Sequence, residues 1–140
     1  MKFSAAVVLL FQHFLRIDAT GECGEVTMKE WGGEKPRSVE YLPRPVDLVI
    51  VQHTATPECS TDRQCADRVK SIQSYHMDRL HYDNIGENFL VGGNGAVYAG
   101  RGWLHAGAHT RGYNGRSVGV SFIGDFSGKY LACGAFASTR

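Results

Sequence analysis

The amino-acid sequence predicts a layered α/β or α+β domain built on a mixed β-sheet. Three observations support this class: a continuous apolar run at 48–51, a helical repeat over 62–80, and a glycine-centred hairpin at 87–102 with an alternating segment after it. The order strand, helix, hairpin, strand implies a mixed sheet within such layers. The chain has 140 residues, of which 43% are hydrophobic, enough for one domain but not for two.

The first predicted elements lead to a histidine at a strand end. Residues 26–33 have the pattern of a short strand or turn, and Pro36, Pro43 and Pro45 mark a linker. The apolar run at 48–51 fits a strand covered on both faces. His53 follows this strand, a position well placed to ligate a metal or to touch a ligand at the rim of a sheet.

A helix is predicted from Asp62 to about Leu80. The tetrapeptide Thr-Asp-Arg-Gln at 61–64 matches a capping box. Four residues then fall at helical spacing on one face: Cys65, Val69, Ile72 and His76.

A hairpin and a final strand complete the predicted sheet. Strands at 89–91 and 96–98 flank Gly-Gly-Asn-Gly at 92–95, and Asn-Gly is a strong turn signal. A glycine-rich loop of this kind can also cradle phosphate, but no helix with a Lys-Ser/Thr signature follows it. Val118, Val120 and Phe122 alternate, which predicts a strand that ends near residues 124–126.

Composition and the N-terminus indicate a secreted protein. A formal charge of +1 and a pI near 7.7 give no basic footprint for nucleic acid. After the start of the chain, no apolar run is long enough to span a bilayer. Residues 1–21 have the pattern of a signal peptide, with Lys2, an apolar stretch at 4–11 and small residues at 19–21. An amphipathic N-terminal helix is the alternative.

The four cysteines suggest two disulfides, since secretion permits them. Cys59 and Cys65 are close enough for a short bridge that pins a loop to the helix start. This pairing leaves Cys23 with Cys133, which would join the two ends of the chain. A zinc cluster is the rival interpretation, but the spacing contains no C-x-x-C.

Several ordered motifs between about residues 26 and 128 resemble those of the peptidoglycan recognition proteins, the animal relatives of bacterial zinc amidases. The motifs are Val-Ile-Val-Gln-His-Thr at 49–54, Ile-Gln-Ser-Tyr-His-Met at 72–77, Asp-Asn-Ile-Gly-Glu-Asn-Phe-Leu-Val-Gly-Gly at 83–93, Tyr-Ala-Gly-Arg-Gly-Trp at 98–103, Gly-Ala-His at 107–109, Gly-Tyr-Asn at 112–114 and Ser-Val-Gly-Val-Ser-Phe-Ile-Gly at 117–124. The resemblance implies a central mixed sheet flanked by helices, with a muramyl-peptide groove on one face. It further implies one domain over 22–140, of the short secreted type, without the family's C-terminal helices.

The resemblance also bears on catalysis. Catalytic relatives hold Zn²⁺ with three ligands and leave a fourth position for water. His53 falls on the first family ligand, but no histidine follows Gly128, and Cys133 resembles a structural cysteine instead. Glu87 replaces the family's catalytic tyrosine, and a carboxylate opposes a developing oxyanion. Glu87 as a general base is the alternative. We therefore expect no cofactor and no amidase activity, with His53 at most a vestigial metal ligand.

The ligand-binding positions implied by the resemblance are better preserved than the catalytic ones. They are His53, Thr54, His76, His81, Tyr82, Glu87, Arg101, His109 and Asn114. In family members that prefer diaminopimelate peptides, an arginine at 101 pairs with a carboxylate that lysine-type stems lack. The dipeptide His81-Tyr82 matches neither stem class. Each of these positions also has a purely structural alternative: a core histidine at 76, turn-capping roles at 109 and 114, and a surface charge at 101.

Three functional hypotheses follow. The first is a secreted, non-catalytic receptor that binds bacterial peptidoglycan in innate immunity, with other immune-signalling proteins as possible partners. The second is a zinc-dependent N-acetylmuramoyl-L-alanine amidase. The third is a truncated isoform that folds and binds poorly, because the loss of covering helices would expose apolar faces of the strands at 48–51 and 118–122.

Overall fold

A five-stranded sheet organises the protein. The computed structural model describes residues 24–128, and in it the strands are β1 (Glu25–Val26), β2 (Leu48–His53), β3 (Phe89–Val91), β4 (Val97–Ala99) and β5 (Ser117–Phe122). Their spatial order is β1-β4-β3-β5-β2, with β3 and β4 antiparallel and the other neighbours parallel. The predicted mixed sheet is therefore confirmed.

The predicted helix is also confirmed, in two segments. Helix α2 covers Asp62–Ser74, and the π-helical turn η1 continues it over Tyr75–Arg79. The Thr61 side chain caps the helix by accepting a hydrogen bond from the backbone N–H of Gln64. The predicted disulfide joins Cys59 to Cys65, with 5.1 Å between the two Cα atoms, and ties the preceding loop to the first turn.

The hairpin and the last strand lie where the sequence predicted them. Gly95 closes the turn between β3 and β4 with a φ of +82°, a conformation that glycine adopts without strain. Strand β4 begins one residue later than expected, at Val97. Strand β5 covers the alternating segment from Ser117 to Phe122.

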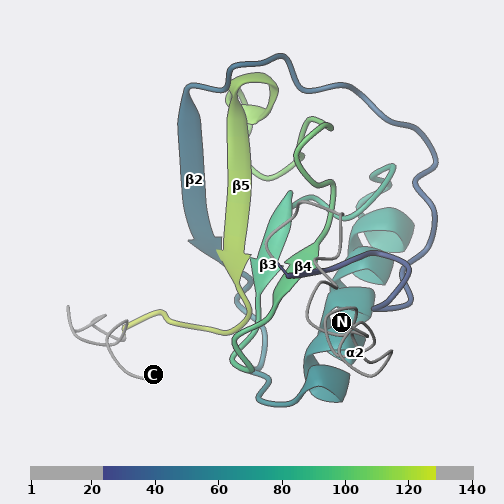
Figure 1. Cartoon of the computed structure of the whole chain (residues 1–140), viewed down its shortest axis with the longest axis vertical. Helices are drawn as coiled ribbons and strands as arrows, with labels where there is room; N and C mark the ends of the chain where they lie inside the picture. Colours follow the sequence, from purple (N-terminus) through teal and green to yellow (C-terminus); the bar gives the residue numbers. More distant parts are fainter. Residues whose placement is uncertain (1–23, 129–140) are drawn as a thin grey trace, which may run out of the picture.

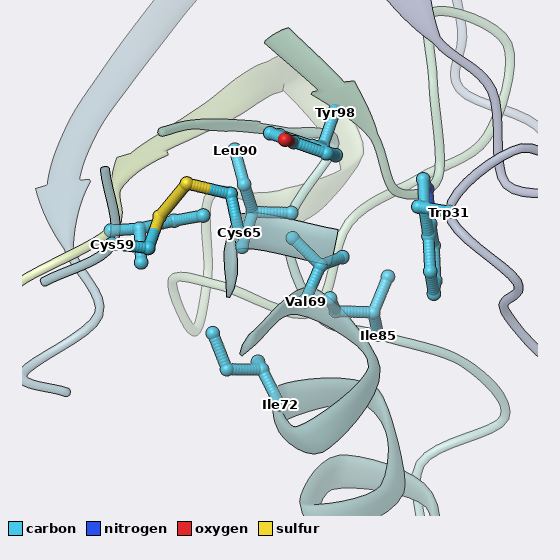
Figure 2. Close-up of a cluster of buried hydrophobic side chains, with 9 residues drawn as sticks. Trp31, Cys59, Cys65, Val69, Ile72, Ile85, Leu90 and Tyr98 are labelled. Carbon is cyan, nitrogen blue, oxygen red and sulfur yellow. A yellow bond between two sulfur atoms is a disulfide. The ribbon is translucent and has the colours of Figure 1, made fainter. Parts of the chain in front are cut away.

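Two buried clusters cover the two faces of the sheet. Helix α2 packs on one face, and its side chains meet Leu90, Tyr98 and Trp31 there, as Figure 2 shows. On the other face a smaller cluster forms from Leu42, Phe89, Ala106 and Val118. Because side chains alternate along a strand, each strand in the middle of the sheet supplies residues to both clusters.

Strand β2 departs from the prediction. It forms the edge of the sheet, with β5 as its neighbour and α2 over the opposite end (Figure 1). Val49 and Val51 are each 63% exposed, so the strand is not covered on both faces. Of the two strands expected to be exposed, β2 is exposed, whereas the inner strand β5 is largely buried, with Val118 only 2% exposed.

Two sequence-based expectations lie outside the described residues. The signal peptide at 1–21 and the Cys23–Cys133 bridge fall on segments for which residues 24–128 give no information. Within the described part of the chain, no helix has the length and apolar character needed to cross a membrane.

The exposure of β2 predicts an asymmetric response to two matched substitutions. Val49 and Val118 are direct partners in the β2–β5 register. We expect Val118→Ala to lower the free energy of unfolding by about 2 kcal/mol, because it removes two buried methyl groups, and Val49→Ala to lower it by less than about 0.5 kcal/mol. Urea denaturation of both variants measures this difference. Equal losses would show that the outer face of β2 is covered.

Candidate ligand-binding site

The site lies beside the first residues of β5, which extend past the start of β3. Strand β5 begins at Ser117, whereas β3 begins at Phe89, which pairs with Val120. The loop that follows β4 lies next to these first residues of β5, and the fully buried side chain of Asn88 holds the loop there. The Asn88 amide donates to the carbonyl oxygens of Gly102 and His105, at 2.8 Å each, and accepts from the backbone N–H of Gly119 at 2.9 Å.

Arg101 is fixed by backbone acceptors on two sides. Its Nε donates to the carbonyl oxygen of Ile85 at 2.8 Å, and its Nη1 donates to that of Ala106 at 3.0 Å. Among residues 24–128, no carboxylate lies within 4.0 Å of the guanidinium. Burial lowers the pKa of Arg101, yet a guanidinium stays charged in proteins. The site therefore holds a preorganised cation without an ion pair.

Glu87 and His76 lie close together without forming an ion pair. The Glu87 side chain is 12% exposed, and its buried Oε2 has no hydrogen-bond partner. His76 Nδ1 stands 3.7 Å from Oε2, but it accepts the backbone N–H of Gly86 at 3.0 Å. Burial raises the pKa of Glu87, and burial together with Arg101 lowers the pKa of His76. Both shifts oppose a charged pair.

His109 lies against the sheet over two glycines. A Cβ built on Gly107 or Gly119 would stand 2.7 Å from His109 Nε2, so both positions need glycine to make room for the ring. Its Nδ1 is 3.1 Å from the Thr110 hydroxyl, while the buried Nε2 has no hydrogen-bond partner. Burial, followed by the charge of Arg101, lowers the pKa of His109. The ring is thus neutral at pH 7, with one polar atom left for a ligand.

Asn114 positions the loop that carries His109. Its Oδ1 accepts from the backbone N–H groups of His109 at 3.1 Å and Thr110 at 2.8 Å. The turn-capping interpretation therefore describes what its carbonyl oxygen does. Thr54 has a similar role, since its hydroxyl lies 2.7 Å from that of Thr56 and accepts the backbone N–H of Gly124 at 3.1 Å.

The remaining predicted residues follow η1. Tyr82 packs beside His76, with 5.4 Å between the ring centroids, and its backbone N–H donates to the His76 carbonyl oxygen at 2.9 Å. His81 is exposed and adopts a φ of +57°, so it forms the bend that brings Tyr82 back to the helix. The structure thus gathers His76, Tyr82, Glu87, Arg101 and His109 into one cluster, here called the Arg101 cluster.

His53 lies at the end of β2, and its role as a ligand-binding residue stays a prediction. Its Nδ1 accepts the backbone N–H of Phe126 at 2.9 Å and lies 3.7 Å from Asp125 Oδ1. The neighbouring residue Gln52 reaches the loop that carries His109, since its Nε2 lies 3.3 Å from the Thr110 hydroxyl.

Asn88 is a site residue that sequence reasoning misses. It lies within the motif at 83–93, but its residue type and spacing predict no role for it. A polar residue directly before an apolar strand carries little local signal, because its partners, at Gly102, His105 and Gly119, lie far along the chain.

Within residues 24–128, no group of three or more His, Cys, Asp or Glu residues is arranged to hold a metal ion. At the end of β2 the imidazole of His53 is a group that zinc sites use, and its Nδ1 accepts the backbone N–H of Phe126 at 2.9 Å. Residues 129–140 lie outside the described part of the chain, so they do not enter this comparison.

Comparison with known proteins identifies the family. Residues 42–137 match the family model described as N-acetylmuramoyl-L-alanine amidase. A peptidoglycan recognition protein of Trichoplusia ni is 55% identical over 120 residues, which make up 86% of this chain and 66% of that protein. The chain belongs to the peptidoglycan recognition protein family. It spans about two thirds of the length of the curated relatives it matches.

Solved structures of the peptidoglycan recognition family agree with the fold. The bumblebee protein PGRP-SA superposes with a TM-score of 0.75 at 46% identity, covering 79% of this chain and 67% of that one. The ectodomain complex of PGRP-LCa and PGRP-LCx, solved with bound tracheal cytotoxin, gives a TM-score of 0.75 at 43% identity, covering 79% and 68%. The mixed sheet with its helix is thus the family fold.

The buried carboxylate predicts a pH-dependent stability difference. The folded state of the wild type holds the Glu87 proton to higher pH than the unfolded state, whose pKa is near 4.5. Wild-type stability therefore falls as the pH rises above 4.5, and Glu87→Gln removes this loss. We expect the variant to be more stable by about 1 kcal/mol at pH 7 and to lose this advantage on acidification.

Denaturant titrations of both proteins between pH 4 and pH 7.5 measure the difference. His76, whose Nδ1 lies 3.7 Å from Glu87 Oε2, is coupled to the substituted group, so the comparison reports on the Glu87–His76 pair. A difference that does not change with pH would contradict the assigned state of Glu87.

Proposed function

We propose that this chain binds the muramyl peptide of bacterial peptidoglycan and does not hydrolyse it. The observation that carries the proposal is the cation at Arg101, which two backbone carbonyls hold in place and which has no carboxylate partner among residues 24–128. A guanidinium fixed in this way is suited to bind a carboxylate through its remaining N–H groups. Stem peptides carry such carboxylates.

The unsatisfied atoms around Arg101 support a ligand site. Buried polar atoms in folded proteins almost always have hydrogen-bond partners. In the described residues three buried side-chain atoms lack one, and two of these, Glu87 Oε2 and His109 Nε2, belong to the Arg101 cluster. A ligand rich in amides, hydroxyls and charged ends would satisfy both. Arg101 also favours diaminopimelate stems over lysine stems, since it supplies a partner for the additional carboxylate.

The residues at the catalytic positions support binding without hydrolysis. Glu87 stands in place of the family's tyrosine, and among residues 24–128 no group of three His, Cys, Asp or Glu residues is arranged to hold a metal that could activate water. The zinc amidase remains the second candidate, favoured by the family match over residues 42–137.

A secreted, immune role is the wider part of the proposal. The N-terminal sequence has the pattern of a signal peptide, and the disulfide between Cys59 and Cys65 suits an oxidising compartment. Relatives named as peptidoglycan recognition proteins, and a related complex solved with tracheal cytotoxin, are consistent with detection of bacterial wall fragments. Other immune-signalling proteins would then be the downstream partners.

Substitution of Arg101 tests the binding proposal. We expect Arg101→Ala to weaken retention of the purified protein on insoluble diaminopimelate-type peptidoglycan by about tenfold or more, because a charge-assisted hydrogen bond is lost. Arg63→Ala, at the exposed first turn of α2, is the matched control and should bind like the wild type. Binding titrations on both stem types give the comparison. Unchanged retention of Arg101→Ala would refute the assigned role.

A cleavage assay separates the two candidate functions. We expect protein supplied with Zn²⁺ to release no stem peptide from peptidoglycan, since His53 belongs to no group of three metal-ligating residues among residues 24–128. Mass spectrometry of the soluble products and metal analysis after dialysis provide the measurement. Stoichiometric zinc together with turnover would establish the amidase instead.

A further inference from the structure

Opposite charges lie close together at the open end of the β3–β4 hairpin without forming an ion pair. The backbone N–H of Arg101 donates to the carbonyl oxygen of Glu87 at 2.9 Å. The N–H of the preceding residue, Gly100, donates to the Asn88 carbonyl oxygen, so donors on consecutive residues break the regular β3–β4 ladder here. Each charge acts on the other, since Arg101 opposes the rise in the pKa of Glu87 and Glu87 opposes the fall in the pKa of Arg101.

The structure shows why this pair does not close. The Arg101 guanidinium is drawn to the carbonyl oxygens of Ile85 and Ala106, which set its direction. Glu87 Oε2 remains buried and without a partner. His76 does not compensate, because the nitrogen facing Oε2 at 3.7 Å is occupied as an acceptor of the Gly86 N–H. A lone pair, rather than a proton, therefore faces the carboxylate.

We propose that Glu87 and Arg101 together bind the zwitterionic head group of an amino acid, with its ammonium on Glu87 and its carboxylate on Arg101. A free α-amino acid end carries both charges on a single carbon. It can bridge the cation and the anion of the site with complementary polarity, so that each buried charge gains a partner. A carboxylate ligand alone would satisfy Arg101 and leave Glu87 Oε2 unpaired.

This inference rests on the proposed function and names the part of the ligand that Glu87 and Arg101 recognise. A stem peptide presents such a head group at the side-chain end of a diaminopimelate residue, provided that its amine is free. A cross-link between stems acylates this amine and removes its charge. The protein would then discriminate free stem ends from cross-linked ones, and so favour loose wall fragments over the mature network.

Calorimetric titration with two synthetic tripeptide stems tests the inference. One stem ends in diaminopimelate with a free side-chain amine, and the other carries the same amine acetylated. We expect the wild type to bind the free-amine stem at least about tenfold more tightly, as for a charge-assisted hydrogen bond to a buried group. Glu87→Gln should lose this preference by weakening only the free-amine complex. Glu34→Gln, at an exposed carboxylate, is the control and should keep it.

The outcomes separate this inference from the proposed function. Equal affinity of the wild type for both stems, or a preference that persists in Glu87→Gln, would overturn the Glu87 subsite while peptidoglycan binding stands. Failure of the wild type to bind either stem or insoluble peptidoglycan would overturn both. The comparison of two ligands on the wild type alone does not depend on the folding of any variant.

Discussion

The hydrogen bonds of the Asn88 side chain are the constraint on which the site depends. One buried carboxamide joins the loop after β4 to strand β5, using both of its donors and its acceptor. Leaving such groups unpaired inside a protein would cost about 1–3 kcal/mol each, so the loop has a strong reason to adopt this path. Arg101 lies within that loop. The backbone of Arg101 therefore takes its path from Asn88, while the carbonyl oxygens of Ile85 and Ala106 direct its guanidinium.

The side chains of β2 have two different environments. Val49 and Val51 are each 63% exposed on one face, whereas the Gln52 amide, on the other face, reaches the loop of His109 and Thr110. The inner strand β5 contributes to both buried clusters and stays covered. The Arg101 cluster is thus anchored to the best-packed part of the sheet, through Asn88 and the glycines under His109.

Local patterns predicted the elements well. The capping residue at Thr61, the helical spacing from Cys65 to His76 and the Asn-Gly turn each specify structure through neighbouring residues, and each is confirmed. The exposure of β2 was missed because an apolar run does not reveal whether a strand is central or at an edge. The position of Arg101 could be inferred from family resemblance, whereas its carbonyl contacts and the unpaired oxygen of Glu87 arise only from tertiary packing.

The central claim is that a guanidinium held by two carbonyl oxygens is the receptor for the ligand's carboxylate. The most direct measurement is a crystal structure of the protein with a diaminopimelate stem peptide. We expect the carboxylate to contact Arg101 within hydrogen-bond distance while the bonds to Ile85 and Ala106 persist. A peptide bound instead on the outer face of β2, with the Arg101 cluster unchanged, would contradict it.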